Sequence, residues 1–430
     1  MYLSEELSTK WKSILEHEDV PEIKDKHRRA VTAQMLENQV KEMGQSGQAL
    51  SEASDTPVNQ TGNVSNYDPV LISLVRRSMP NLIAYDMCGV QPMTGPTGLI
   101  FAMRPKYVRN GKLAEDAFYD EADTAHSGAG THDGNTSPSV LNNGGSFQTG
   151  TGMDTNAAEL LGTEQGESWA EMGFEIDKIS VEAKSRALKA QYSVELAQDL
   201  RQIHGLDAET ELANILATEI LAEMNREIMR TVYTIAKPGA ANADLAQQGT
   251  FDLELDGNGR WSVERFKGLL FQVDREANRI AKETRRGRGN VIICNSDVAS
   301  AFNASGQMEN PAGGPGLNVD DTGNTFAGVL NGQYRVYIDP YHDGEDFFTI
   351  GYKGTSPFDA GLYYCPYVPL QMYKAQSEDS FQPKIGFKSR YGIVANSFAE
   401  GSNRGQGRLN PNSNVYYRRV RVASLFGAGT

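Results

Sequence analysis

Motifs that bind phosphate or activate a nucleophile are missing from this sequence. It contains no Gly-x-x-x-x-Gly-Lys-Ser/Thr loop, so phosphoryl transfer on a P-loop is not expected. It contains no Gly-x-Ser-x-Gly turn, which marks the nucleophile of α/β-hydrolases. The segment Gly287-Arg288-Gly289 lacks the third glycine of a dinucleotide-binding turn, and the neighbouring strand follows it instead of preceding it.

Acidic residues form two groups whose chemistry has to be considered. Glu171, Glu175 and Asp177 lie close together along one predicted strand, but a glycosidase would also need an aromatic cleft, which the sequence does not indicate. The acidic segment 252–256 has the spacing that begins a calcium-binding loop. The glutamate that should end such a loop is missing at the required distance, so we expect a polar turn.

Histidines and cysteines are too scattered to predict a metal site. There is no His-Glu-x-x-His or Cys-x-x-Cys motif. His126 and His132 lie in the loosest predicted loop, where we expect surface residues. Cys88, Cys294 and Cys365 are far apart, and we expect three buried, reduced thiols. We therefore predict no catalytic residue, no metal and no cofactor, and a protein that is not an enzyme.

Three arginines form a basic cluster that is a candidate binding or contact site. Arg285, Arg286 and Arg288 occupy a turn between a predicted helix and a strand. They could contact phosphate, form a solvated turn, or pair with acidic groups of another subunit, and we keep them as candidate intersubunit contacts. The formal net charge of -14 argues against a duplex-DNA binder, which usually has a basic face. If the protein is associated with nucleic acid, we expect it to enclose the nucleic acid without binding it tightly.

Length and composition indicate a folded protein with much loop, arm and contact surface. The chain has 430 residues, 39% hydrophobic residues and 43 glycines, so two or three domains, or one with long extensions, are expected. The acidic N-terminal segment has no signal-peptide pattern. No stretch approaches the roughly 18 apolar residues of a membrane span. We expect a protein that is made in the cytoplasm.

Residues 1–52 differ from the rest because they are highly charged and have helical periodicity. Apolar residues from Leu3 to Leu15 recur on one helical face, and Pro21 should interrupt the pattern. An ordinary solvated pair of helices and an oligomerising or scaffold-like leader are both open. Residues 44–66 are rich in Gly, Ser, Thr, Asn and Gln, which predicts an extended linker.

The most regular helical pattern begins after Asp207 and runs to about residue 236. Its apolar residues keep to one face, Asp207 is a plausible N-cap, and Pro238 ends it. At about 1.5 Å per residue this helix would be about 40 Å long and would serve as a strut. A glycine- and serine-rich stretch at 127–152 should be a mobile surface loop.

Shorter helices and strands complete the expected structure. The mixed helix and strand pattern after residue 260 would also suit an α/β enzyme. We predict a short helix at 68–79, a helix at 266–283, and strands at 99–108, 174–181, 183–192 (where a helix could equally begin), 291–294, 334–338, 347–351, 362–368, 385–394 and 415–422.

Several segments resemble the major capsid protein of T-even-type tailed bacteriophages. They are long, occur in the same order and cover most of residues 70–422. The segments are RRSMPNLIAYD (76–86), AKSRALKAQYSVELAQDL (183–200), FKGLLFQVDREA (266–277), FAGVLNGQYRVYIDPY (326–341), DAGLYYCPYVPL (359–370) and YYRRV (416–420).

The resemblance implies an α+β fold of the Hong Kong 97 type, with an N-terminal arm, an extended E-loop, a peripheral domain built on a long spine helix, and an axial domain. A T-even-type protein also has an inserted domain, for which this chain has only a shortened, glycine-rich region at 127–165. The expected division is a cleavable scaffold-like leader (1–52), arm and start of the peripheral domain (53–94), E-loop (95–170), peripheral domain (171–240), axial domain (241–385) and C-terminal strands that return to the peripheral domain (386–430).

The resemblance also implies a cleavage site at the end of the leader. Leu50, Ser51 and Glu52, followed by Ala53, look like the apolar-x-Glu site of the prohead protease. The tripeptide recurs elsewhere, for example at 221–223, but inside the long predicted helix. Cutting after Glu52 would discard scaffold contacts, clear the interior and make shell expansion irreversible.

The implied function is self-assembly into hexamers of a head shell that encloses double-stranded DNA. The implied partners are further copies of the chain, the vertex capsid protein, a scaffold core, the prohead protease, the portal and possible decoration proteins, with DNA enclosed but not specifically bound and no membrane. The implied location is the virion, assembled in the host cytoplasm. Three alternatives are open: a pentameric vertex paralogue, a nanocompartment shell, and a cytoplasmic enzyme with an unrecognised site.

Overall fold

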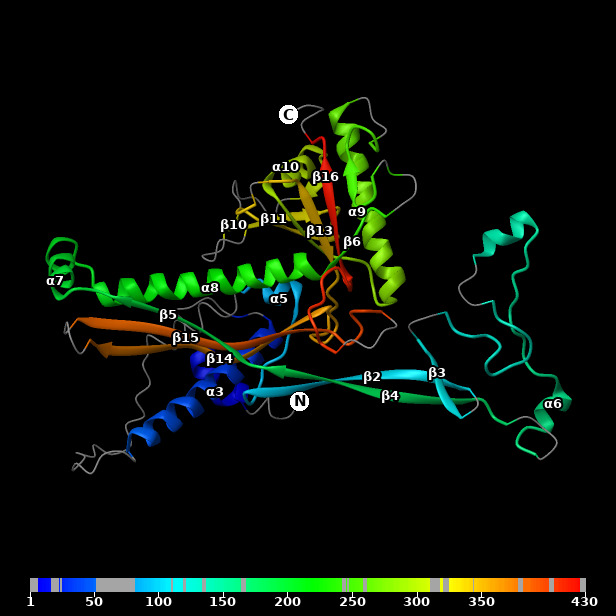
Figure 1. Cartoon of the computed structure of the whole chain (residues 1–430), viewed down its shortest axis with the longest axis horizontal. Helices are drawn as coiled ribbons and strands as arrows, with labels where there is room; N and C mark the ends of the chain where they lie inside the picture. The colour runs from blue at the N-terminus through cyan, green and yellow to red at the C-terminus, as the bar shows by residue number, and fades with distance from the viewer. Residues whose placement is uncertain are drawn as a thin grey trace.

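The computed structural model describes most of the chain between residues 7 and 425. The helix predicted at 68–79 and the arm after Glu52 lie outside the described residues. Helices and strands form separate layers, so the predicted α+β class is confirmed (Figure 1). The described residues are 7–16, 23, 25–51, 82–109, 111–118, 121–133, 137–163, 168–241, 245, 247–257, 261–309, 318–319, 325–342, 344–377, 382–401 and 406–425.

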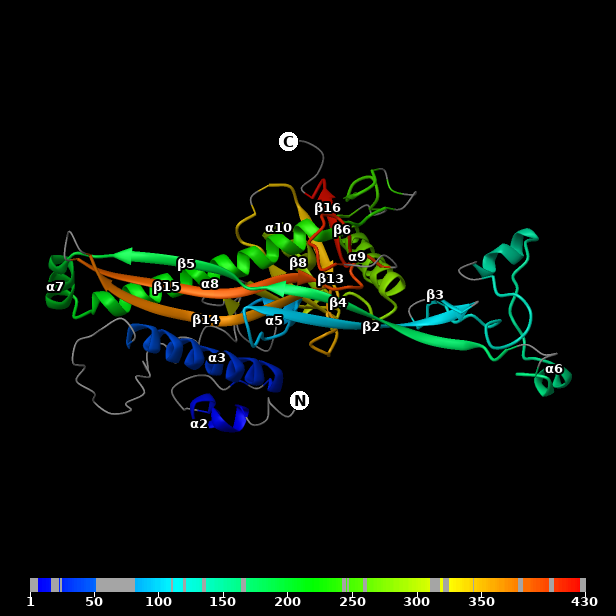
Figure 2. The same cartoon turned by 60° about the horizontal axis from the view of Figure 1, so that its bottom comes forward.

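A four-stranded sheet runs through the centre of the elongated body. Its order is β1-β14-β15-β5, with β14 and β15 forming a long antiparallel hairpin. Helix α8 packs on β5 and β15, and helix α3 packs on β14 from the other face (Figure 2). Cover on both faces explains the nearly continuous apolar run of β14. The strands are β1 (Gly89–Val90), β5 (Lys184–Gln191), β14 (Leu362–Gln376) and β15 (Pro383–Ala395).

The long helix α8 (Ala208–Ile235) confirms the predicted strut, because it runs without a break for 28 residues, or about 42 Å. Its buried residues, such as Met224 and Ile228, recur every three or four positions. Asp207 is at the N-cap position, but its carboxylate does not cap the backbone as predicted. It accepts a hydrogen bond from the Thr210 hydroxyl at 2.9 Å instead. Helix α7 (Val194–Ile203) precedes α8 at the end of the body (Figure 1).

The N-terminal segment forms the predicted pair of helices, α2 (Lys12–Leu15) and α3 (Lys26–Ser51). These helices are not a solvated pair. Five of their large apolar side chains are buried in the main hydrophobic core: Trp11, Leu15, Val31, Met35 and Leu36. Helix α3 also extends through residues 44–51, so the predicted extended arm or linker at 44–66 is wrong for these residues, whereas 52–66 lie outside the described residues.

A nine-stranded sheet forms a second layer beyond the C-terminal end of α8 (Figure 1). Its main order is β10-β11-β12-β8-β13-β16-β6, with β7 paired to β16 and β9 to β11. Helices α9 (Ser262–Thr284) and α10 (Ser296–Ala304) pack against it. The strands are β6 (Ala236–Pro238), β7 (Thr250–Asp252), β8 (Val291–Cys294), β9 (Met308–Glu309), β10 (Asn318–Val319), β11 (Thr325–Leu330), β12 (Tyr334–Ile338), β13 (Phe347–Gly351) and β16 (Asn414–Ala423).

Strand pairing crosses the predicted domain border at residue 385, and the domain division itself stays a prediction. Strand β14 lies in the predicted axial segment 241–385, but it pairs along its whole length with β15, which extends through 386–395. Strand β16 lies in the segment 386–430 that was predicted to return to the peripheral domain, and it pairs with β13 of the nine-stranded sheet. The cause is the short connection at 377–382, which keeps β14 and β15 in one hairpin.

A narrow ribbon of three strands leaves the body on the side opposite to α7 (Figures 1 and 2). It consists of β2 (Thr97–Arg109), β3 (Lys112–Asp116) and β4 (Glu171–Glu182), in the order β3-β2-β4. Beyond β3 the chain forms a long excursion whose described residues include the 3-10 turn η2 (Pro138–Asn143) and a short helix, α6 (Thr155–Glu159). A further short helix, α5 (Ala84–Met87), leads into β1. In the described part of the chain, no helix is both long enough and apolar enough to cross a membrane.

Candidate assembly surface

One face of the ribbon is apolar and exposed. Strands β2 and β4 are paired without interruption from Thr97↔Glu182 to Val108↔Glu171. Because side chains alternate along a strand, Phe101 and Met103 share a face with Phe174 and Ile176 of β4. Phe101 is 65% exposed and Phe174 is 60% exposed. Leu99 and Met172 extend the same exposed face, which we call the apolar ribbon face (Leu99, Phe101, Met103, Met172, Phe174 and Ile176).

The opposite face of the ribbon carries charged side chains that neutralise one another. Arg104 forms ion pairs with Asp177 at 2.7 Å and with Asp116 at 3.1 Å. Lys106 lies between Asp116, at 3.4 Å, and Glu175, at 3.3 Å. Glu175 and Asp177 therefore serve as structural counterions, and their spacing does not produce a pair of catalytic carboxylates.

Arg104 also fastens the ribbon to the body. Its side chain is only 2% exposed, and its Nη2 donates a hydrogen bond to the Ser397 carbonyl oxygen at 2.7 Å. The guanidinium lies 4.5 Å from the centre of the Phe398 ring, a cation–π distance. Since Ser397 and Phe398 belong to the chain after β15, Arg104 marks the point where the ribbon separates from the body.

The ribbon thus reverses the usual arrangement of a strand, in which the apolar face is buried and the charged face meets solvent. Its charged face is turned inward and paired, and its apolar face is turned to solvent. An isolated soluble protein has no need for a contiguous apolar strip of this kind, and such a strip marks an interaction surface. No described residue of the same chain covers it.

The chain that follows β3 is also exposed. Phe118 is 78% exposed and has a positive φ of 72°, a conformation that bulky residues rarely adopt. Beyond it, the excursion through 121–163 is closed by the β-bridge Ala129↔Thr151 and by hydrogen bonds such as Gln148 to Asp133, and it contains no buried residue among those described. The glycine-rich region predicted at 127–152 is therefore a surface loop, as expected.

Two of the three predicted contact arginines have partners within the chain. Arg286 pairs with Asp359 at 3.3 Å, and Arg288 pairs with Asp274 at 3.0 Å. Arg285 ends helix α9 with a φ of 53° and is exposed, without an ion pair to any residue that the structure describes. The cluster is thus mostly a structural turn, and an intersubunit role for the three remains a prediction.

The remaining candidates for chemistry have structural surroundings. His126 contacts the Glu171 carbonyl oxygen, and His132 contacts the Thr124 hydroxyl, both at the surface. In the acidic segment 252–256, Asp252 and Asp256 accept hydrogen bonds from the backbone of the same turn. Among the described residues, no group of histidine, cysteine and acidic side chains is arranged to hold a metal ion.

All three cysteines are buried and unpaired, as the sequence predicted. Burial raises the pKa of the Cys88 thiol to about 12, and that of Cys365 also to about 12. Burial raises the pKa of Cys294 as well, with a further contribution from the nearby carboxylate of Asp339. None of them has the lowered pKa of a reactive thiol.

The N-terminal helices contact the body through specific polar bonds. Asn38 of α3 donates hydrogen bonds to the carbonyl oxygens of Met93 and Tyr367, at 2.7 and 2.9 Å. Arg28 pairs with Asp86 at 3.0 Å. Of the predicted cleavage residues, Leu50 and Ser51 are helical, whereas Glu52 and Ala53 lie outside the described residues. We expected the cleavage site to lie in extended backbone. The described residues on its N-terminal side instead form the end of helix α3.

These features define a class of protein: an elongated subunit whose described residues expose a strip of apolar side chains of the kind that marks an interaction surface. The chain matches the family model described as "Major capsid protein Gp23" over residues 64–422, so it belongs to that family. It is a major capsid protein of a tailed phage and a component of the virion.

Relatives of nearly full length support the same family. The major capsid protein of Enterobacteria phage T4 is 38% identical over 516 positions, covering 98% of this chain and 99% of the relative. That of Salmonella phage ViI is 39% identical over 449 positions, covering 99% of each. A solved structure of Microbacterium phage Oxtober96 has 9% identity and a TM-score of 0.41, covering 87% of this chain and 98% of that chain, which is too distant to support a conclusion.

The comparisons also bear on the open alternative of a vertex protein. The capsid vertex protein of Enterobacteria phage T4 is 26% identical over 253 residues, covering only 56% of this chain. The major capsid protein of the same phage is more similar and covers almost the whole chain. The major protein is therefore the better assignment.

Proposed function

We propose that this chain forms the hexameric capsomers of the phage head, with the ribbon acting as the E-loop that lies over a neighbouring subunit. The observation that carries the proposal is the apolar ribbon face, which none of the described residues of the same chain covers. In this division, α8 is the spine of the peripheral domain, and the nine-stranded sheet is the core of the axial domain.

We also propose that residues 1–52 are a leader that the prohead protease removes after Glu52. The boundary fits the change in composition, and the end of a helix is a place where a protease finds accessible backbone. In the precursor the leader would contact a scaffold core. The finished shell would add the vertex capsid protein, the portal and possible decoration proteins, and would be assembled in the host cytoplasm around DNA that it encloses without specific binding.

The hexamer proposal is tested with a ribbon variant. Full-length chain produced in bacteria should form particles with a hexagonal lattice in electron micrographs. Replacing Phe101 and Phe174 together by serine should abolish these particles and leave the dissociated subunit as stable to urea as before, because both side chains are exposed. A matched control replaces Leu255, which is also exposed and lies on the other layer, by serine.

A stable monodisperse monomer of the unaltered chain at high concentration would overturn the hexamer proposal. The leader proposal is tested separately by the intact mass of subunits from finished virions. We expect a chain that begins at Ala53, and a chain that still begins at Met1 would reject the leader while leaving the capsid assignment intact.

The intersubunit role of Arg285, Arg286 and Arg288 has its own test. Charge pairs between capsomers would hold the subunits in register more than they add affinity. Replacing all three by alanine should therefore give misassembled particles. Normal shells of normal stability would reduce the cluster to the turn described above.

A further inference from the structure

The short helix α5 joins separate parts of the body. It lies between α8 and the N-terminal helices in both views (Figures 1 and 2). The Ile83 backbone amide donates a hydrogen bond to the Asn225 side chain of α8 at 3.2 Å. The Tyr417 hydroxyl of β16 donates a hydrogen bond to the Met87 carbonyl oxygen at 2.7 Å. Residues 83–87 therefore connect α8 with the nine-stranded sheet.

The proposed leader also contacts α5 and the strand that follows it. Arg28 of α3 donates a hydrogen bond to Oδ1 of Asp86 at 3.0 Å. The same guanidinium lies 5.0 Å from the centre of the Tyr85 ring, a cation–π distance. The ring of His27 contacts the Val90 carbonyl oxygen of β1 at 3.0 Å. The N-terminal helices are thus attached to the junction that α5 forms.

A second arginine contacts the same oxygen atom of Asp86. Arg335 of β12 donates a hydrogen bond from Nη1 to Oδ1 at 3.3 Å, which is longer than the bond from Arg28. A guanidinium that has a carboxylate to itself can form two parallel hydrogen bonds with it. Because both guanidinium groups are positively charged, each weakens the attraction of the other for the shared carboxylate. Arg28 and Arg335 therefore compete for Asp86.

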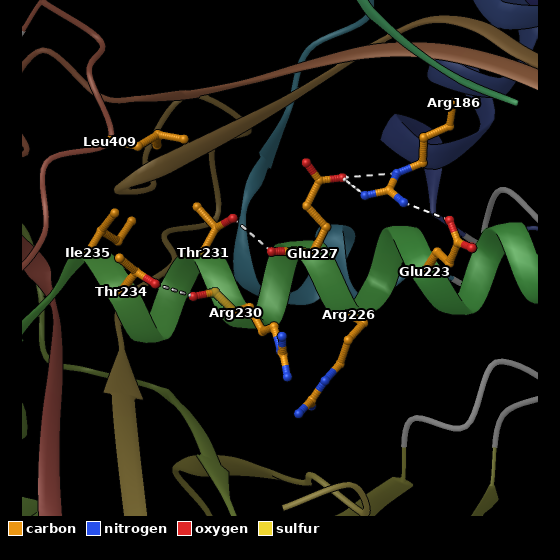
Figure 3. Close-up of a pocket in the computed structure, with 9 residues that line it drawn as sticks. All are labelled: Arg186, Glu223, Arg226, Glu227, Arg230, Thr231, Thr234, Ile235 and Leu409. Atoms are coloured by element: carbon orange, nitrogen blue, oxygen red, sulfur yellow. Dashed lines mark hydrogen bonds and ion pairs between the residues drawn. The ribbon is translucent and has the colours of Figure 1, made fainter.

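The arginines that contact α8 have acidic partners of their own. Arg186 pairs with both Glu223, at 2.6 Å, and Glu227, at 2.7 Å (Figure 3). Arg226 pairs with the buried carboxylate of Asp339 at 2.6 Å. The pairing at α5 differs because two arginines share one oxygen, and because one of them belongs to the segment 1–52 while the other belongs to the nine-stranded sheet.

We propose that Asp86 exchanges partners when the leader is removed. In the full-length chain Arg28 and Arg335 share its carboxylate, and after the cut Arg335 pairs with it alone and fastens α5 to β12. Arg28 has a second acidic neighbour within the leader, Asp25 at 3.8 Å, with which it departs. This inference rests on the proposed removal of residues 1–52. The exchange replaces part of the lost contact with α3 by a stronger contact with the sheet.

A cycle of single and double substitutions in the full-length, dissociated subunit tests the sharing. After Arg28→Met or Arg335→Met alone, the remaining arginine still balances Asp86, so each loss should be small. The double variant leaves the carboxylate without either arginine. Its folding equilibrium constant, measured by urea denaturation, should fall at least about fivefold below the value expected from the product of the two single effects.

The control repeats the cycle in an Asp86→Asn background. With the carboxylate removed, Arg28→Met and Arg335→Met have no common charge to balance, and their effects should multiply simply. If the effects also multiply simply when Asp86 is present, the two arginines act independently and the inference is overturned.

Shells before and after the cut test the exchange itself. Precursor shells from phage with an inactive prohead protease keep the leader, so Arg28 can replace Arg335 there. Arg335→Met should leave the rate of thermal disruption of precursor shells almost unchanged and raise that of finished shells at least about tenfold, because Asp86 then has neither arginine. The rate is measured by light scattering at a fixed temperature.

An exposed ion pair of the same sheet is the matched control. Arg421 of β16 pairs with Glu345 at 2.7 Å, and both side chains are largely exposed. Arg421→Met should change precursor and finished shells alike, by less than about fivefold. If Arg335→Met accelerates both kinds of shell equally, the exchange is refuted. If subunits of finished virions still begin at Met1, the leader proposal fails and the exchange with it; if they begin at Ala53 and the two kinds of shell respond alike, only the exchange fails.

Discussion

Arg104 carries its charge in a buried environment. Its guanidinium is 2% exposed and is balanced by Asp116 and Asp177. Removing one member of a buried ion pair leaves uncompensated charge, which typically costs about 3–5 kcal/mol. We expect Arg104→Met to lower the free energy of unfolding of the dissociated subunit by about 3 kcal/mol, measured by urea denaturation.

The control for Arg104 lies on the same strand. Arg109 also pairs with an acid, Asp123, but its side chain is half exposed. Exposed ion pairs contribute about 0–1 kcal/mol, so Arg109→Met should change the stability by less than about 1 kcal/mol. Equal effects of the two substitutions would show that Arg104 is not an anchor.

The cysteines give a second prediction for single residues. At pH 8, a thiol with a pKa of about 12, such as Cys88 or Cys365, is a thiolate in only about one molecule in ten thousand. We expect no modification of the three cysteines by a maleimide at pH 8 in the folded chain, and modification of all three in urea. Rapid labelling of any of them without denaturant would contradict the burial described above.

Among the elements, α8 should contribute most to the stability of the body. Met224 is fully buried, and its sulfur lies 3.9 Å from both the Tyr364 and the Ser389 hydroxyls, so it joins α8 to β14 and β15. Met224→Ala should cost about 2–5 kcal/mol, measured by urea denaturation. Ile215→Ala on the same helix should cost far less, because Ile215 is 62% exposed. Similar losses at both positions would mean that α8 is not packed as described.

The elements predicted from the sequence are those that local pattern determines. The period of α8 and the apolar run of β8 depend on neighbouring residues alone, and both were found where expected. Helices α7 and α10 were missed, although Ser193 and Asn295 cap them through their side chains and were readable signals. The helical end of α3 was missed because packing on the body overrides the weak propensity of its glycines and serines.

The sequence predicts the apolar alternation of the assembly surface but not its exposure to solvent. The alternation of Leu99, Phe101 and Met103 predicts a strand with an apolar face, but alternation does not say whether that face meets a core or solvent. The answer depends on which chain covers it. The pairing of Arg104 with Asp177 depends on the register of β2 and β4, which are separated by the long excursion, and no local pattern specifies it.

At the scale of the whole molecule, the N-terminal helices α2 and α3 add substantially to the stability of the core. Their five buried apolar side chains contribute of order 10 kcal/mol at about 2 kcal/mol each, comparable to the net stability of a domain. We expect a chain produced without residues 1–52 to aggregate instead of assembling, measured by sedimentation. Shells assembled from full-length chains and then cut should remain intact, because neighbouring subunits also support the body by then. Normal shells from the shortened chain would contradict this.

The contact between Asn38 of α3 and the carbonyl oxygens of Met93 and Tyr367 has a consequence for timing. While α3 is covalently attached, it meets its site at an effective concentration in the millimolar range and rebinds after every opening. A single cut after Glu52 changes no atom of that contact but makes it bimolecular. From then on, its occupancy depends on dilution, and a helix that diffuses away does not return. Cleavage would thus lower the probability that the released helix rebinds its site, without changing the interactions of the contact itself.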